Sequence, residues 1–226
     1  MRKTKQKKKQ AVVLLSGGLD SATTLYEALA KGFVCRCLLF DYGQRHKKEL
    51  TRARRVADSA GCDADIIKIR MPWQGSSLLD RSQSLPLGRA EIPLTIPSTY
   101  VPSRNIIFLS FAASFAEAVG ARDIFIGANA VDYSGYPDCR PEFYAAYQQA
   151  LDTGTKAGVE RRRIKIHTPL IHKTKAQIIR RGIKLGVPYE LTWSCYAGGR
   201  RPCGECDSCL LRAKGFAEAG IEDPAL

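Results

Sequence analysis

Apolar residues along the chain follow two alternating patterns. Short continuous apolar runs rich in β-branched residues are typical of strands buried in a parallel sheet. Stretches with apolar residues at helical spacing, some of them ended by glycine, are typical of helices packed on a sheet. We expect strands at 11–15, 33–40, 65–69, 123–127 and 163–167, and helices before Gly32 and at 46–60, 105–119, 142–156 and 175–185. This alternation predicts an α/β domain with a mostly parallel sheet and helices on both of its faces.

Two segments depart from this alternation. Residues 71–103 hold five of the eleven prolines, and a loop this long in a compact domain is usually functional or mobile. Our hypothesis is that it closes over a substrate. The C-terminal segment is instead rich in cysteine, glycine and arginine. We therefore divide the chain into a basic disordered tail (1–10), an α/β domain (11–190) and a small metal-organised region (191–226).

The chain is strongly basic, with 35 lysines and arginines against 22 acidic residues and a net charge of +13. Six of the basic residues lie between Arg2 and Lys9, which leaves +7 for the rest of the chain. Such an excess fits a nucleic acid, an anionic membrane or anionic small molecules as partners. The apolar runs are far shorter than the ~20 residues that span a bilayer, and the N-terminus lacks the apolar core of a secretory signal. We expect a cytoplasmic protein without membrane contact.

The first predicted strand is followed by a glycine-containing turn, Ser-Gly-Gly-Leu-Asp-Ser at 16–21. Glycines let backbone N–H groups approach a phosphate, and the following helix N-terminus adds about half a positive charge. The hydroxyls of Ser21 and Thr23 can add hydrogen bonds. The string lacks the Gly-Lys-Ser/Thr of a Walker loop and the G-x-G-x-x-G of a dinucleotide fingerprint. The alternative is a glycine turn in which Asp20 or a serine caps the helix.

This string resembles the PP-loop signature of the adenylating ATP pyrophosphatases. The resemblance implies that the loop holds the pyrophosphate of ATP and that AMP is transferred to an oxygen of the substrate. Asp20 is the natural partner of the Mg²⁺ that accompanies ATP. The implied ATP segment consists of Leu15, Ser16, Gly17, Gly18, Leu19, Asp20, Ser21, Ala22, Thr23, Thr24 and Leu25.

Four cysteines close to the C-terminus have metal-ligand spacing. Cys195, Cys203, Cys206 and Cys209 form C-x7-C-x2-C-x2-C, and four thiolates suit a tetrahedral Zn²⁺. An iron–sulfur cluster and a redox disulfide pair are the alternatives. Because four cysteine ligands leave no open position for a reactive water, we expect a structural metal. The other cysteines are interpreted as core or incidental thiols; they are Cys35, Cys37, Cys62 and Cys139.

Several further strings narrow the resemblance. They are D-Y-G-Q-R-H at 41–46, P-S-R-N at 102–105, S-G-Y-P-D-C-R at 134–140 and H-T-P-L at 167–170. With the PP-loop and the cysteines, they closely resemble the 7-cyano-7-deazaguanine synthase family (QueC) over nearly the whole chain. The resemblance implies an ATP-dependent ligase that converts 7-carboxy-7-deazaguanine and ammonia, through an amide, into 7-cyano-7-deazaguanine for queuosine biosynthesis. It also implies a zinc site at the four cysteines and a homodimer.

The remaining candidates concern ATP and the substrate. Asp41 and Tyr42 end the second predicted strand, where an adenosine moiety could rest. Arg104 and Lys175 are candidate phosphate cations with catalytic roles, although Lys175 fits a surface salt bridge equally well. A third group is assigned to the deazaguanine edge or its carboxylate, with a simple turn as the alternative; it comprises Asp132, Asp138 and Arg140.

Two other functions fit parts of the sequence. A PP-loop tRNA-modifying enzyme would account for the basic tail, but no added RNA-binding domain or aromatic–basic stacking segment is recognisable. A zinc-ribbon module that binds nucleic acid would account for the cysteines, but the intact ATP loop argues against it. We therefore expect small-molecule substrates rather than direct binding of nucleic acid.

Overall fold

The computed structural model describes residues 9–73, 75–88, 96–130 and 135–225. Its centre is a five-stranded sheet in which every neighbouring pair is parallel, with the order β3-β2-β1-β4-β5. The strands are β1 (Gln10–Leu14), β2 (Val34–Asp41), β3 (Asp63–Lys68), β4 (Asp123–Phe125) and β5 (Lys165–His167). The expected parallel α/β fold is therefore confirmed.

Burial along the strands explains why the first apolar run forms the middle of the sheet. β1 lies between β2 and β4, and its Val12 and Val13 are fully buried on opposite faces. A strand covered on both sides must be apolar at consecutive positions. β3 lies at the edge, where Ile66 remains 46% exposed.

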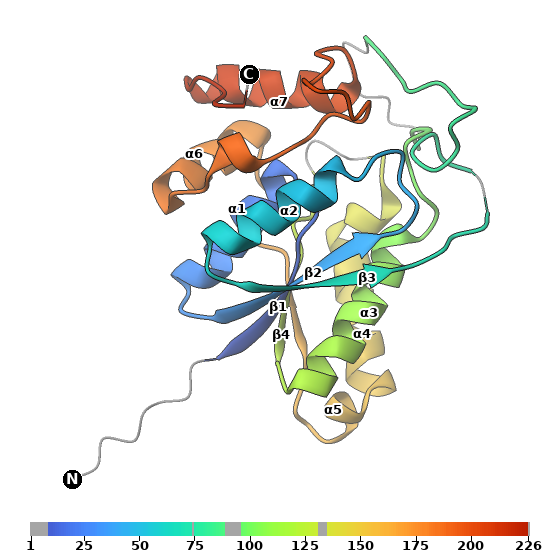
Figure 1. The fold of residues 1–226 in the computed structure, drawn as a ribbon. Helices are drawn as coiled ribbons and strands as arrows, with labels where there is room; N and C mark the ends of the chain where they lie inside the picture. The colour runs from blue at the N-terminus through green and yellow to red at the C-terminus, as the bar shows by residue number, and fades with distance from the viewer. Residues whose placement is uncertain (1–8, 74, 89–95, 131–134, 226) are drawn as a thin grey trace.

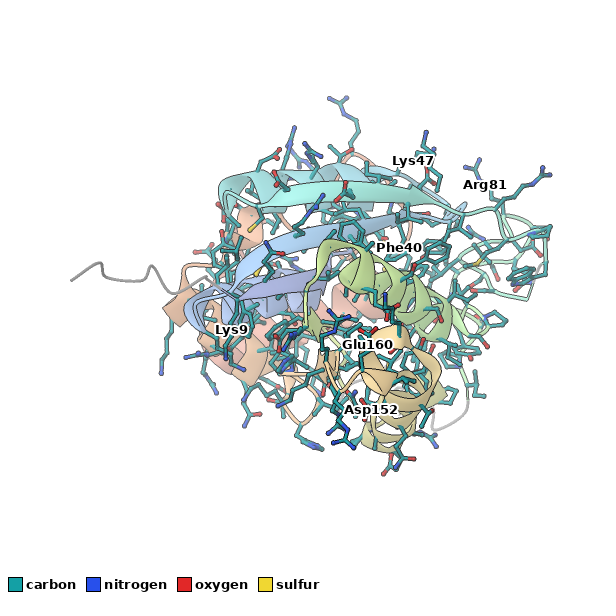
Figure 2. The ribbon with its side chains drawn as sticks, turned by 90° about the horizontal axis from the view of Figure 1, so that it is seen from below. Lys9, Phe40, Lys47, Arg81, Asp152 and Glu160 are labelled. Atoms are coloured by element: carbon teal, nitrogen blue, oxygen red, sulfur yellow. The ribbon has the colours of Figure 1, made fainter. Side chains whose placement is uncertain are left out.

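Helices cover both faces of the sheet, as Figure 1 shows. One apolar cluster joins the sheet to the four helices of the first face: α1 (Leu19–Ala30), α2 (Lys48–Ser59), α6 (Lys175–Leu185) and α7 (Asp207–Ala219). A second cluster serves the other face, with α3 (Arg104–Val119), α4 (Pro141–Gly154) and α5 (Lys156–Val159). On that face the rings of Phe40 and Phe108 stack with centroids 4.0 Å apart, and Figure 2 labels Phe40 at this place.

Several element boundaries differ from the sequence-based expectations; β4, for example, ends at Phe125 rather than at residue 127, and β3 begins at Asp63 rather than at residue 65. The predicted helix at 142–156 is divided, because Thr155 is extended (φ −115°, ψ 154°) and its side chain accepts from the N–H of Gly158 at the start of α5. The last strand begins at Lys165 rather than at residue 163. β1 includes Gln10, which the sequence placed in the tail. Residues 1–8 of that tail lie outside the described ranges.

Described residues of the proline-rich segment at 71–103 make hydrogen bonds with Arg45 and with the C-terminal region. Arg45 donates from its guanidinium to the carbonyl oxygens of Ser77 (2.5 Å) and Asp80 (2.9 Å). Leu87 forms an isolated bridge to Cys206, and Gly88 donates to the carbonyl of Glu205 (3.0 Å). The described part of this loop therefore contacts the C-terminal region, while its closure over a substrate stays a prediction.

Two short 3₁₀ helices complete the architecture, η1 (Pro137–Cys139) and η2 (Tyr189–Leu191). Within the described ranges, every helix is too short or too polar to cross a lipid bilayer.

Candidate functional site

A cavity opens at the carboxyl ends of the central strands. Its walls come from the turn after β1, Tyr42 after β2, Arg104 at the start of α3 and Gly127 after β4. Lys175 of α6 and residues of the C-terminal region complete it. Ligands of open parallel sheets bind at this edge, where helix N-termini converge. Elements that are far apart in the sequence thus bring several of the candidate residues to the same cavity.

The glycine turn brings backbone donors to this cavity. Leu19, Asp20 and Ser21 form the first turn of α1, whose N–H groups have no acceptor within the helix, and all three line the cavity. The hydroxyl of Ser21 donates to the carbonyl of Gly18 (3.0 Å) and accepts from the N–H of Ser16 (3.2 Å). The turn is therefore held in shape by its own side chains while the helix N-terminus faces the space for an anion.

Gly17 holds this turn against α2. It adopts a left-handed backbone conformation (φ +83°), and a Cβ there would lie 2.4 Å from the carbonyl oxygen of Glu49 and 2.7 Å from the nitrogen of Ala53. No side chain fits in that space. The absence of a side chain at Gly17 therefore lets the first turns of α2 contact the glycine turn directly. We call this turn, residues 16–21, the phosphate loop after the role that its sequence predicts.

The expected ATP segment is divided by the fold. Leu15, Ser16, Gly18, Leu19, Asp20 and Ser21 line the cavity. Gly17 and the later residues of the segment do not; they are Ala22, Thr23, Thr24 and Leu25. The Thr23 hydroxyl, which the sequence suggested as a donor to the ligand, instead lies in the core beside the carbonyl of Leu19 (2.9 Å) and the hydroxyl of Tyr189 (2.8 Å).

Asp20 and Lys175 form an ion pair at the floor of the cavity. The ammonium of Lys175 donates to both carboxylate oxygens of Asp20, at 2.9 and 2.7 Å. Lys175 therefore forms a salt bridge, as the alternative expected, but with side chains only 8% and 19% exposed the pair is largely buried rather than at the surface. Gly215 of α7 makes room, since a Cβ there would lie 2.3 Å from Cγ of Lys175. The pair joins the N-terminal turn of α1 to that of α6.

Arg104 adds a half-buried cation to the cavity. Its guanidinium donates to the hydroxyl of Tyr42 (3.5 Å). Burial alone would lower the pKa of Arg104, but Tyr42, Tyr136 and Asp138 outweigh burial and raise it. The guanidinium therefore remains charged where it lines the cavity, which suits a phosphate or an adenylate.

Asp41, Asp138 and Arg140 do not line the cavity. Asp41 pairs with Lys47 (2.8 Å) and lines a neighbouring hollow rather than the cavity. Asp138 is buried behind the wall, where its carboxylate accepts from the N–H of Asn105 (3.1 Å) and burial raises its pKa. Arg140 is exposed and does not line the cavity. Asp132 lies outside the described residues.

The four C-terminal cysteines meet, as their spacing predicted. The sulfur atoms of Cys195, Cys203, Cys206 and Cys209 all lie within 4.8 Å of one another, a group that could hold a metal ion. The Sγ atoms of Cys203 and Cys209 are 3.9 Å apart, and a tetrahedral ion with bonds of about 2.3 Å to sulfur requires a similar spacing. The N–H of Cys203 donates to the sulfur of Cys195 (3.3 Å). The donor set therefore fits a four-coordinate metal.

This cysteine cluster is connected to the phosphate loop. The indole N–H of Trp193 donates to the carbonyl of Cys195 (2.8 Å), and the backbone N–H of Trp193 donates to the carbonyl of Gly17 (2.8 Å). A ring nitrogen of His46 lies 3.0 Å from the same Cys195 carbonyl. The cluster therefore fixes one wall of the cavity as well as its own loop.

Sequence reasoning missed several residues of the cavity. Glu49 and Cys139 line it, and burial raises the pKa of the Cys139 thiol to about 12. Cys35 and Cys37, by contrast, are buried in the core as expected. Other lining residues that were not among the candidates include Gln44, Phe108, Asn129, Tyr136, Trp193, Tyr196, Ser208 and Arg212. Gln44, Tyr136 and Cys139 lie within the strings at 41–46 and 134–140 that carry the family resemblance, but only the fold shows that these residues reach the cavity.

Lys175→Met is expected to reduce ATP turnover by about 100-fold or more, because it removes a preorganised cation and leaves Asp20 without its bidentate partner. Steady-state AMP release measures the effect. Arg181→Met is the matched control, since Arg181 lies on the same helix and pairs with Glu27 of α1 outside the cavity. Equal turnover in the two variants would contradict a role for Lys175 in the site.

Comparisons with known proteins agree on one family. A family model described as "Queuosine biosynthesis protein QueC" matches residues 10–220. A 7-cyano-7-deazaguanine synthase from Thermoplasma acidophilum is 56% identical over 96% of this chain and 91% of its own length. One from Syntrophotalea carbinolica is 57% identical, with 96% of both chains covered. The solved structure of NMN synthetase from Francisella tularensis matches with a TM-score of 0.51 at 17% identity, over 96% of this chain and 79% of that one, which shows a shared fold.

Proposed function

Because the chain belongs to the QueC family of queuosine biosynthesis proteins, we propose that it converts 7-carboxy-7-deazaguanine and ammonia into 7-cyano-7-deazaguanine at the expense of ATP. The observation that carries this proposal is the cavity in which the phosphate loop, the Asp20–Lys175 pair and Arg104 surround one space. The backbone donors of the loop and the cations Lys175 and Arg104 suit both an anionic nucleotide and an anionic carboxylate.

The chemistry proceeds in two stages at one site. A carboxylate oxygen is a poor leaving group, so it first attacks the α-phosphorus of ATP and pyrophosphate leaves. Ammonia then displaces AMP and gives the amide. The amide oxygen is adenylated in turn, and loss of AMP leaves the nitrile. One phosphate loop serves both stages because each activates an oxygen on the same carbon.

The described residues divide this work between them. The N-terminal turn of α1, with Ser16, Gly18 and Ser21, holds the phosphates. Lys175 and Arg104 offset the charge that develops as pyrophosphate leaves. Mg²⁺ bound with ATP would supply further charge neutralisation, and Asp20 is the carboxylate that would face it.

Aromatic rings provide a place for the flat deazaguanine. Phe108, Tyr136 and Trp193 line the cavity, and such rings pack well against a heteroaromatic base. We assign Asp138 a positioning role through Asn105, which lines the cavity. Contacts of Asp132 and Arg140 with the substrate carboxylate, and of Asp41 with adenosine, stay hypotheses. Alanine variants test them by the KM for each substrate, which should rise if the contact exists.

We propose zinc as the metal at the four cysteines. Four thiolates with no open position favour a structural Zn²⁺, and an iron–sulfur cluster requires iron and sulfide instead. Elemental analysis of the purified protein should give one zinc per chain. Iron with visible absorbance would overturn the assignment.

We also propose a homodimer that acts without binding nucleic acid. Sedimentation or light scattering measures the mass in solution, and a monomeric mass would contradict the dimer. Titration with unmodified tRNA tests the second part. Binding that weakens steeply with salt would instead favour a tRNA-modifying enzyme.

The central experiment is incubation with 7-carboxy-7-deazaguanine, ATP, Mg²⁺ and ammonium, followed by mass spectrometry. We expect the amide first and the nitrile later, with two molecules of AMP released for each nitrile. The matched control omits ammonium and should yield neither product. Absence of amide and nitrile from the complete mixture would overturn the proposed function.

A further inference from the structure

A second carboxylate lines the cavity, and the roles above do not use it. Glu49 lies in the first turn of α2. Among the described lining residues, Asp20 and Glu49 carry the carboxylates. Both oxygens of Asp20 are held by Lys175. The pKa of the Glu49 carboxyl responds to burial and to the charge of Arg104, and no described residue donates a hydrogen bond to its carboxylate. Its oxygens are therefore available to a ligand.

Backbone packing places the start of α2 beside the glycine turn at 16–21, and the Glu49 residue lines the cavity there. The carbonyl oxygen of Glu49 occupies the space that a Cβ at Gly17 would need, only 2.4 Å away. The first turn of α2 therefore rests on the phosphate loop. A substrate carbon joined to an α-phosphate at that loop would share the cavity with Glu49.

The electrostatic surroundings raise the pKa of Glu49. Burial raises the pKa of Glu49 to about 7, although the nearby Arg104 opposes the shift. A group whose pKa lies near the working pH accepts and releases protons most effectively. Near neutral pH Glu49 is then present in both protonated and ionised forms, and the ionised fraction rises with pH.

Other titratable groups facing the cavity are poor candidates for this role. Burial raises the pKa of Tyr42 and Tyr136, and that of Cys139 to about 12, so these groups keep their protons near neutral pH. Lys175 is occupied by Asp20. Among the described residues, the other ionisable groups that line the cavity with Glu49 are Asp20, Tyr42, Arg104, Tyr136, Cys139, Lys175, Tyr196 and Arg212.

We infer that Glu49 is the general base that removes protons from the substrate nitrogen. This inference rests on the proposed function. In the first stage the lone pair of ammonia bonds to the carbonyl carbon, the bond from carbon to the AMP oxygen breaks, and AMP leaves with the electron pair. Glu49 takes one proton from nitrogen, which leaves the neutral amide.

The second stage needs two further proton removals. When the amide oxygen bonds to the α-phosphorus and pyrophosphate leaves, the nitrogen becomes acidic and gives one proton to Glu49. After Glu49 has released that proton to solvent, it takes the last one while the bond to AMP breaks and the nitrile forms. Adenylation of the carboxylate itself transfers no proton from nitrogen.

Glu49→Gln separates these steps. We expect carboxylate-dependent pyrophosphate release in a single turnover without ammonium to stay within about threefold of the native rate. Conversion of the amide to the nitrile should fall by about 100-fold or more, the usual contribution of a general base. Asp58→Asn is the matched control, because Asp58 lies on the same helix, pairs with Arg54 and does not line the cavity; both rates should be unchanged.

The pH dependence of amide conversion provides a second test. A purely structural role of Glu49 would not alter the shape of this pH profile. With the preformed amide as substrate, the ionisation of ammonium does not enter the measurement. The native rate should rise as Glu49 loses its proton and level off above a pH of about 7. The Gln variant should lack this rise, and Glu49→Asp should restore part of it.

Three results would overturn the inference: an unchanged amide-to-nitrile rate in the Gln variant, an equal loss of adenylation, or a native pH profile without the rise. If the native protein forms neither amide nor nitrile, the proposed function itself fails. If it forms both and the Gln variant does so equally fast, only the role of Glu49 fails.

Discussion

Cys206→Ser is expected to release the bound metal, loosen the C-terminal region and reduce nitrile formation to near background. The four sulfurs lie within 4.8 Å of one another, so loss of one thiolate opens the coordination shell. Structural zinc contributes about 10–16 kcal/mol of apparent binding free energy in small zinc-finger peptides, and that energy is coupled to folding. Metal content, limited proteolysis of the C-terminal region and turnover measure the three effects.

The loss of activity follows from the contacts of Trp193. Its indole donates to the carbonyl of Cys195 and its backbone N–H donates to the carbonyl of Gly17. A loosened cysteine loop therefore withdraws support from the phosphate loop. Cys62→Ser serves as the control, because Cys62 lies outside the cluster. A metal-free Cys206 variant with native turnover would show that the metal does not support the cavity.

Gly17→Ala is expected to abolish measurable ATP turnover and to lower the free energy of unfolding. The new Cβ would lie 2.4 Å from the carbonyl oxygen of Glu49 and 2.7 Å from the nitrogen of Ala53, so α2 must move away from the loop. Displacement of a catalytic group by about 1 Å can cost 100-fold in rate, and this substitution moves two walls of the cavity. Turnover and urea unfolding measure the two effects.

Gly32→Ala separates backbone strain from the steric overlap. Gly32 has nearly the same left-handed conformation (φ +82°), and a Cβ there meets nothing within 4 Å. We expect this control to cost about 1 kcal/mol of stability and to leave turnover unchanged. If both variants lose activity equally, the contact between Gly17 and α2 is not what shapes the site.

Local patterns in the sequence account for much of the fold. The continuous apolar run at 11–15 predicts a central strand, and β1 is buried on both faces. The helix expected at 175–185 appears with those bounds, because Thr174 and Gln177 form a capping box and Gly186 ends it. The boundary at Thr155 escaped prediction, since a helical apolar pattern continues through a residue whose backbone is extended.

The sequence predicted the site most completely where its residues are close together in the chain, although the distant candidates Tyr42, Arg104 and Lys175 also line the cavity. The phosphate loop and the four cysteines have fixed spacings, so their chemistry is visible in the chain. Asp41 and Tyr42 show the limit: they are adjacent, yet only Tyr42 lines the cavity, because successive side chains near a strand end point in opposite directions. Thr23 likewise lies on the core side of α1 rather than toward the ligand.

By itself, then, the sequence determined the parallel α/β fold, the phosphate loop and the cysteine group, because each depends on interactions between near neighbours along the chain. Only the tertiary structure decided that Lys175 pairs with Asp20, 155 positions away, and that Glu49 and Trp193 meet at the phosphate loop. These contacts depend on how closely neighbouring elements pack. Gly17 and Gly215 allow close packing because neither has a side chain that would separate it from α2 or from Lys175, respectively. Packing distances of this kind depend on both partners together and are not encoded in either segment alone.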